Sequence, residues 1–165
     1  MELYNPGFTF TIDYPDETGK IIQVKLHNLM PTAAINYMIA AAFTAGSAYA
    51  NFYLGLYGNA RVPLITDSMT TFMADCGEIV DYTGTARPAI VFPAVANGTL
   101  TTAADPNEFT FAAPYTVRGV FISTSPTWLG TSGLLVSARL LPSPKTGTAD
   151  EPLRAPVGFS FVGGA

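Results

Sequence analysis

Side chains suited to nucleophilic or metal chemistry are scarce in this chain. It contains one histidine, His27, and one cysteine, Cys76. A Ser-His-Asp set would have to use His27, but the sequence has no Gly-x-Ser-x-Gly elbow. One cysteine forms no intrachain disulfide, and a zinc site would depend mostly on carboxylates, which are not clustered at ligand spacing. We therefore interpret Cys76 as a buried or half-buried thiol and His27 as a surface or hydrogen-bonded side chain.

Three acidic residues are close enough in sequence to suggest the carboxylate pair of a glycosidase. Asp75, Glu78 and Asp81 fall where a short helix is expected to turn into a strand. Acids at such a turn mostly cap the helix or face solvent. A glycosidase that uses two of these three carboxylates stays an open alternative. A second acidic group, at positions 13–17, lacks the twelve-residue pattern of a calcium loop, and glycine-rich phosphate loops are absent. The sequence indicates a protein that is not an enzyme and needs no cofactor.

Charged side chains are sparse along the whole chain. Of 165 residues, 12 are acidic and 8 are basic, whereas 48% are apolar. A typical soluble domain is about 25% charged, and mixed surface charge usually keeps such a domain soluble. The basic residues are scattered singly, which argues against nucleic acid as a partner, since that interface needs a clustered basic face. We infer a surface that other subunits cover, as in a homo-oligomer.

The sequence does not predict a membrane protein. Its most apolar stretch, residues 33–43, spans 11 residues. A transmembrane helix needs about 20. The first six residues carry neither the basic region nor the apolar region of a signal peptide. We therefore expect no membrane partner and no classical secretion signal.

Hydrophobic alternation predicts an all-β chain. Apolar residues at 8, 10, 12 and 14 alternate with polar ones, and the pattern returns at 22–26 after a turn. Further candidate strands follow at the spacing of a sandwich: 51–57, 78–82, 87–92, 98–102, 108–112, 117–123, 133–141 and 157–162. We predict one antiparallel β-sandwich domain over residues 1–165, and a jelly roll is one topology of this kind.

The spacing of apolar residues and the capping residues also predict one short helix and one helical turn. Pro31 and Thr32 are start signals, and the helix should end near 44–46. Its expected core-facing stripe has helical spacing: Ile35, Met38, Ile39 and Ala42. The helical turn should span 67–75, with Asp67 as its N-cap.

Two loops stand out as candidate interaction sites. Residues 123–132 carry the chain's only tryptophan, and residues 142–156 contain four prolines. We predict that 142–156 is a proline-rich loop or arm, either reaching across a neighbour or lying disordered on the surface. The predicted interface residues come from the N-terminal strand and from these two loops: Phe8, Phe10, Tyr14, Trp128, Leu129, Lys145 and Arg154.

The order of several sequence blocks resembles a family of small virion proteins of tailed bacteriophages. The blocks lie within about residues 26–140: AAINYMIAAAF, NFYLGLYGNA, TDSM, GEIVDYTGTARPAIVFP, GTLTTAADPNEFTF, VRGVFIST and GLLVSARLL. The resemblance implies a structural component of the virion, either a head cement or decoration protein or a tail or fibre accessory part. Our leading hypothesis is a capsid cement protein on the outside of the virion, made in the host cytoplasm. Its expected partners are the major capsid protein, copies of itself, or both. The alternative is a tail or fibre module for host recognition, in which Trp128 would stack on sugar rings.

Overall fold

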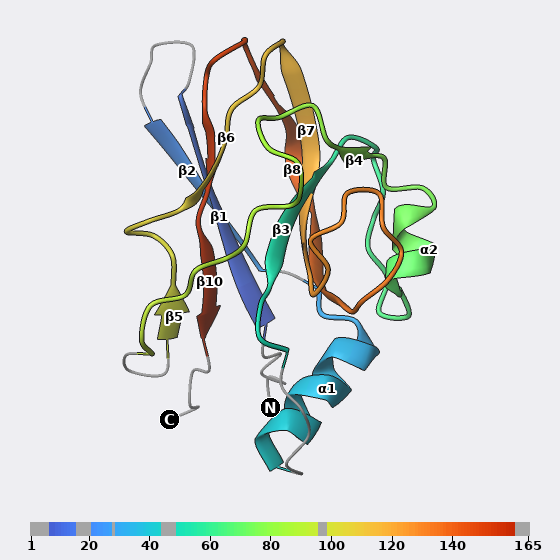
Figure 1. The fold of residues 1–165 in the computed structure, drawn as a ribbon. Helices are drawn as coiled ribbons and strands as arrows, with labels where there is room; N and C mark the ends of the chain where they lie inside the picture. The colour runs from blue at the N-terminus through green and yellow to red at the C-terminus, as the bar shows by residue number, and fades with distance from the viewer. Residues whose placement is uncertain (1–6, 16–20, 28, 44–48, 96–98, 161–165) are drawn as a thin grey trace.

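The structure, a computed structural model, describes residues 7–15, 21–27, 29–43, 49–95 and 99–160 (Figure 1). Strands dominate it, and only two helices occur in this part of the chain. The strands are β1 (Gly7–Pro15), β2 (Ile21–His27), β3 (Tyr53–Tyr57), β4 (Glu78–Ile79), β5 (Thr99–Thr101), β6 (Asn107–Phe109), β7 (Tyr115–Ser123), β8 (Leu135–Gly147), β9 (Leu153–Ala155) and β10 (Val157–Ser160). The helices are α1 (Thr32–Phe43) and α2 (Met69–Met73).

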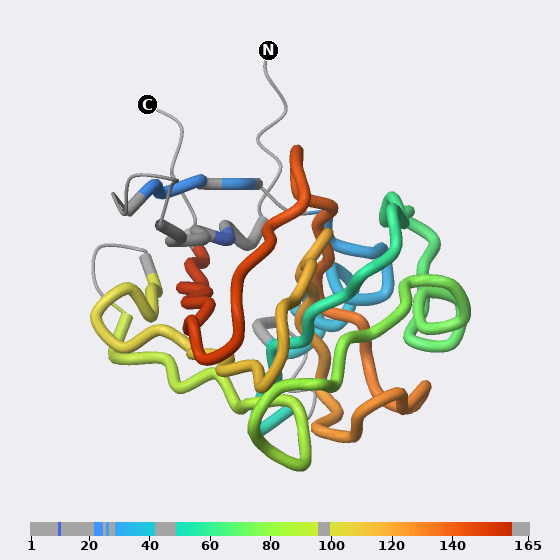
Figure 2. Tube along the Cα trace, turned by 90° about the horizontal axis from the view of Figure 1, so that it is seen from above, coloured from blue at the N-terminus to red at the C-terminus, as the bar shows by residue number. Residues whose placement is uncertain are grey.

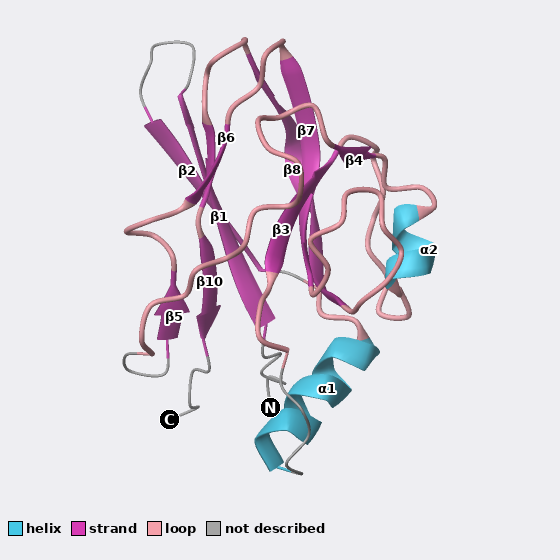
Figure 3. Ribbon diagram, viewed as in Figure 1, coloured by secondary structure: helices cyan, strands magenta, loops and turns pink. Residues whose placement is uncertain are grey.

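The strands form two antiparallel sheets (Figure 3). In the first sheet, β1 pairs with β2 along one edge and with both β9 and β10 along the other. Since only Pro156 separates β9 from β10, the two act as one interrupted strand, which β6 and β5 extend. The second sheet has the order β4-β3-β7-β8. The predicted all-β antiparallel sandwich with one short helix and a helical turn is confirmed.

The main core lies between the sheets and follows from the period-2 pattern of the strands. Leu54 and Leu56 point into it from β3, and Val120 and Ile122 point into it from β7. Phe10 reaches it from the first sheet and is only 1% exposed. At Phe10, the alternation seen in the sequence therefore selects the buried face correctly.

The outer face of the second sheet is also covered, here by α2 (Figure 1). Phe72 of α2 packs edge-on against Tyr57, with ring centroids 5.3 Å apart, and against Phe121 at 5.5 Å. Each of these strand aromatics stands opposite a glycine in the sheet register, Tyr57 opposite Gly119 and Phe121 opposite Gly55. The rings lie over the glycines, so β3 and β7 are buried on both faces.

The segment predicted as a proline-rich arm is mostly strand. β8 runs through Gly147 and β9 covers Leu153–Ala155, which corrects the expectation of a loop over 142–156. Lys145 pairs with Val117 and Leu140 with Gly119, so residues 141–144 form a bulge opposite Arg118. Pro142 and Pro144 fall in that bulge, where a strand tolerates residues that cannot donate a ladder hydrogen bond.

Other local expectations are confirmed or corrected at single residues. Residues 87–92 form no named strand, and Ala89 makes only an isolated bridge to Tyr53. Among the described side chains of α1, Ala34 is buried. Ile35 and Met38 of the predicted stripe are partly buried against the core, whereas Ile39 is 53% exposed. Ser68, not Asp67, caps α2, through a capping box with Thr71. Neither described helix combines the length and apolar character that crossing a membrane requires.

Candidate functional site

A buried ion pair lies at the base of residues 124–134, which we call the Trp128 loop. Arg87 Nε donates to Glu78 Oε1 over 2.6 Å, and Arg87 Nη2 donates to Glu78 Oε2 over 2.9 Å. Both side chains are fully buried, and the guanidinium carbon lies 5.1 Å from the Phe121 ring centroid. Removing two charges from water is costly unless their remaining donors and acceptors are also satisfied.

The remaining N–H donors of Arg87 are also satisfied, mostly by carbonyl groups of the Trp128 loop. Nη1 donates to the Ser125 carbonyl oxygen over 2.9 Å and to Ser123 Oγ over 3.3 Å, and Nη2 donates to the Gly130 carbonyl over 3.4 Å. The Arg87 backbone N–H donates to the Pro126 carbonyl over 2.9 Å. All five N–H donors of the guanidinium therefore have acceptors. The ion pair fastens the loop to the second sheet at several points.

The tip of the Trp128 loop is held in one backbone conformation. Glu78 Oε2 accepts the Leu129 N–H over 2.5 Å, and the Gly130 N–H donates to the Thr127 carbonyl over 3.2 Å. Leu129 has a φ of 57°, in the left-handed region that leucine rarely adopts. Its side chain is nevertheless 62% exposed. A buried carboxylate thus supports a strained residue whose large apolar side chain faces solvent.

Trp128 packs back onto the protein. Its Nε1 donates to the Tyr82 hydroxyl over 2.8 Å, and the two rings meet edge to face with centroids 5.3 Å apart. Tyr82 in turn packs edge-on against Phe109 of the main core. Burial raises the pKa of Tyr82 to about 12, although the hydrogen bond from Trp128 opposes that rise. Trp128 ties the loop to the core, and Leu129 is the side chain that a partner can reach.

A second apolar surface lies on residues 61–66, which connect β3 to α2 and which we call the apolar loop. Val62, Leu64 and Ile65 are each more than half exposed, and Pro63 between them is buried. Single exposed aliphatic residues are common, but adjacent ones form a patch of the kind found at interaction sites. Among the exposed large apolar residues of the described chain, these three lie closest together in sequence.

The apolar loop is fixed by hydrogen bonds. Asp67 Oδ2 accepts the Leu64 N–H over 2.7 Å, and Asp67 Oδ1 accepts from Arg61 Nη2 over 2.6 Å. The Thr32 N–H at the start of α1 donates to the Ile65 carbonyl over 3.0 Å. A loop that is already ordered loses little conformational freedom when it binds. The patch therefore has the rigidity expected of a contact surface.

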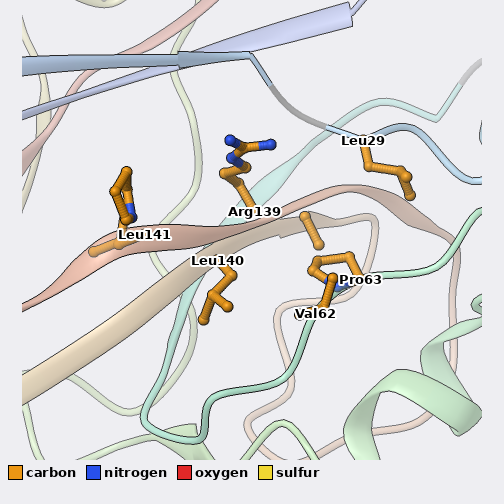
Figure 4. Close-up of a pocket in the computed structure, with 8 residues that line it drawn as sticks. Leu29, Val62, Pro63, Arg139, Leu140 and Leu141 are labelled. Atoms are coloured by element: carbon orange, nitrogen blue, oxygen red, sulfur yellow. The ribbon is translucent and has the colours of Figure 1, made fainter.

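An apolar groove adjoins this loop (Figure 4). Its volume is about 450 Å³, and Arg139 is the charged member of its lining, which consists of Leu29, Val62, Pro63 and residues 138–142. Arg139 is exposed, and it projects from β8 on the side opposite Leu140 (Figure 4). Leu141 and Pro142 belong to the bulge in β8, so the irregular pairing that accommodates the prolines also shapes one wall of the groove.

Two of the predicted interface residues are buried within the chain. Phe10 belongs to the main core, and Lys145, in β8 opposite Val117, is 8% exposed. Because a buried side chain offers a partner no surface, we remove both residues from the interface candidates. Arg154 lies exposed on β9 and pairs with Glu108 over 3.0 Å, so it stays at the surface.

Two further candidates are placed only by their backbone. In the register of the first sheet, Phe8 of β1 lies opposite Phe159, and Tyr14 lies opposite Ile22. The side chains of Phe8 and Tyr14 lie outside the described part of the structure. Of the seven predicted interface residues, Trp128 and Leu129 are therefore the pair that the structure brings together at one site.

The acidic residues considered for glycoside chemistry are used separately. Glu78 is held by Arg87, and Asp75 accepts from Arg61 Nε over 2.6 Å. Asp81 is exposed. Among the residues that the structure describes, no three His, Cys, Asp or Glu side chains gather as ligands for a metal ion.

Cys76 is a packed residue of the cluster under α2. It is fully buried, and its thiol lies 3.8 Å from Met73 Sδ. Burial raises the pKa of the Cys76 thiol to about 12, and the charges of Glu78 and Asp75 add to the rise. Since the thiolate is the reactive form, little of it exists near neutral pH.

We expect Cys76 to react with iodoacetamide only when the protein unfolds. A raised pKa leaves the thiol protonated, and burial prevents access to the reagent. Mass spectrometry of the native protein at pH 8 should show labelling many times slower than in urea. Labelling at equal rates in both conditions would contradict the buried environment of this thiol.

The apolar loop had a sequence signal that strand patterning does not register. Residues 62–65 form an apolar run without alternation, bracketed by Arg61 and Asp67. The groove had no such signal, because its lining comes from three separate segments.

The chain was compared with family models, with curated proteins and with solved structures, and it matches none of them.

Proposed function

We propose that this protein is a structural component of a tailed-bacteriophage virion, a capsid cement or decoration protein that stabilises the major-capsid lattice by non-covalent contacts. The observation that carries the proposal is the rigid, exposed aliphatic patch on the apolar loop of a chain with only 12% charged residues. The sequence blocks that resemble small phage virion proteins are the reason for proposing a phage particle.

The mechanism is mechanical. A protein that binds only the assembled lattice lowers the free energy of that lattice relative to free subunits. Many symmetric contacts of modest size then add up to resistance against the pressure of packaged DNA. The core of such a contact is depleted in charged residues and enriched in apolar ones, and Val62, Leu64 and Ile65 fit that composition. The proposal assigns the chain no catalytic step.

The alternative of host recognition through sugar stacking has weaker support. A stacking platform needs an aromatic face open to solvent, whereas Trp128 is half-buried and its indole N–H is bound to Tyr82. Copy number separates the two functions, because a cement protein matches the capsid lattice and a fibre tip is present in far fewer copies. Quantitative mass spectrometry of purified virions measures this number directly.

Capsid stability tests the proposal. Virions that lack the protein should release DNA at lower temperature and after milder osmotic shock than complete virions, and added purified protein should restore them. Equal robustness with and without the protein, or a copy number typical of a fibre tip, would overturn the proposal.

The apolar loop should account for much of the affinity for the capsid. We expect the double change Leu64→Gln and Ile65→Thr to weaken binding to protein-free capsids about thirtyfold, because about 2 kcal/mol of apolar burial is lost. Surface changes of this kind leave the melting temperature of the isolated protein nearly unchanged. A matched control is Val91→Thr, at an aliphatic residue that is 73% exposed and belongs to neither the apolar loop nor the Trp128 loop. Binding equal to that of the control would exclude the apolar loop as the contact.

A further inference from the structure

We propose that copies of this chain bind one another head to tail, with Leu129 of one copy inserted into the apolar groove of the next. The proposal rests on the proposed function in one respect: a protein that assembles on a lattice has a use for both the Trp128 loop and the apolar groove. The occupant of the groove is thus a second copy, through the tip of its Trp128 loop.

The loop tip has the properties of an anchor residue. Leu129 is 62% exposed in a left-handed conformation that glycine or asparagine would adopt with less strain. Backbone strain of this kind persists only where the surroundings enforce it, and it clusters at functional sites. The surroundings here are the Glu78 carboxylate and the Arg87 guanidinium, both fully buried. A preorganised anchor loses little entropy on binding, which raises affinity without further contacts.

The groove matches this anchor in chemistry. Leu29, Val62 and Pro63 line one part of it and Leu140 and Leu141 another, so a leucine side chain would meet aliphatic groups inside it. Its volume of about 450 Å³ leaves room for a side chain together with part of the loop that carries it. Val62, on the rim, is 60% exposed and would be covered by the contact.

One exposed charged residue belongs to the groove lining, and an exposed residue of opposite charge is the sequence neighbour of Tyr82, which contacts Trp128. Arg139 is the charged residue of the groove lining, and it is exposed. On the loop side, the exposed Asp81 precedes Tyr82, whose hydroxyl accepts the Trp128 N–H. Opposite charges facing each other across an interface set its register and disfavour wrong pairings. We expect Asp81 of the inserting copy to face Arg139 of the receiving copy.

The positions of the two surfaces make the contact heterologous. Seen from above, the Trp128 loop (orange) and the segment that contains the apolar loop (blue-green) lie on different sides of the molecule (Figure 2). A contact between different surfaces of identical chains leaves one of each free at the ends, so it builds a ring when the rotation closes and a chain when it does not. Either product suits a protein that covers a repeating lattice.

Sedimentation velocity of the full-length protein without capsids measures the association. The weight-average mass of the wild type should rise above 17.4 kDa with concentration. Leu129→Asn should weaken the association about thirtyfold or more, as loss of an interface anchor does, while its melting temperature stays equal or rises because asparagine tolerates the left-handed backbone. Val91→Thr is the matched control and should associate like the wild type. A monomeric wild type, or full association of Leu129→Asn, would overturn the inference.

Disulfide trapping tests whether the groove is the receiving surface. One preparation carries Leu129→Cys and the other Val62→Cys, and the native Cys76 is buried in both. Mixed under mild oxidation, they should form a crosslinked dimer, because only close cysteines can bridge. Leu129→Cys mixed with Val91→Cys should form none. Equal crosslinking in the two mixtures would overturn the assignment of the groove.

Charge reversal supplies an independent test of register. Arg139→Glu and Asp81→Lys should each weaken association, and the two changes combined in one chain should restore it. No restoration would contradict the register. Capsid binding by a protein that remains monomeric would overturn this inference and leave the proposed function standing. Association of the chain with itself without capsid binding would overturn the proposed function and leave this inference standing.

Discussion

Arg87→Met should lower the free energy of unfolding by about 3–5 kcal/mol, because it leaves the Glu78 carboxylate buried without its counter-charge. The change also removes the donors that hold the carbonyl groups of Ser125 and Gly130. Urea unfolding followed by circular dichroism measures the loss. Trp128, the only tryptophan, reports on the loop itself, and its emission should shift to longer wavelength as the loop loosens.

An exposed ion pair on the same protein provides the matched control. Arg154 and Glu108 have side chains that are 59% and 46% exposed, and Arg154→Met should cost about 1 kcal/mol or less. The double change Arg87→Met and Glu78→Met should recover part of the loss, since no buried charge remains. The Gly130 carbonyl still lacks its donor in this variant, and the Ser125 carbonyl keeps only the Ser123 hydroxyl. If Arg87→Met costs no more than Arg154→Met, the buried pair does not hold the fold together.

Gly119→Ala should destabilise the protein by about 3 kcal/mol, the upper part of the range for an overpacked core. A Cβ at this position would lie 2.0 Å from Tyr57 Cζ, so the ring has to move. The ring has no free space to enter, because it packs against Phe72 and its hydroxyl donates to the Arg61 carbonyl. The displacement should also loosen the apolar loop. Thermal and urea unfolding measure the first effect, and hydrogen exchange of the Leu64 amide measures the second.

Gly58→Ala is the control for this substitution. It makes the same chemical change next to Tyr57, but the added Cβ would meet Ile79 Cγ1 at an ordinary 3.6 Å. Replacing a glycine where space and backbone allow it stabilises a protein by about 0.4–1 kcal/mol, through the entropy of the unfolded chain. Opposite signs for the two alanine variants are therefore expected. Equal stability of the two would contradict the ring-over-glycine packing of β3 and β7.

Several elements of the fold could be predicted from local pattern alone. Strand alternation around Phe10 and the helix that begins near Pro31 depend on the period of apolar residues, and that period is a property of neighbouring positions. The segment 142–156 could not be predicted in this way. Its prolines indicate a loop when read alone, and only the pairing of β8 with β7 shows that a bulge accommodates them.

Some features of the candidate site could likewise be predicted from the sequence, and others could not. Trp128 and its neighbour Leu129 were identified from the sequence because a bulky apolar residue in a loop, flanked here by Pro126 and Gly130, is costly to expose to water. Their different roles were not predictable, since the direction of each side chain depends on Tyr82 and Glu78, which precede Leu129 by 47 and 51 residues. The groove is more distant still from any sequence signal, because residues from three segments form it.

The sequence by itself determined the low charge of the chain, the class of the fold and the shortage of chemically reactive groups, since these depend on residue types and on spacing along the chain. Only the tertiary structure decided that Glu78 and Arg87 form a buried pair, that Phe10 and Lys145 are internal, and that Leu129 stands exposed on a fixed backbone. The physical reason is that burial and ion pairing are set by groups far apart in sequence. Their partners become neighbours only when the two sheets have packed.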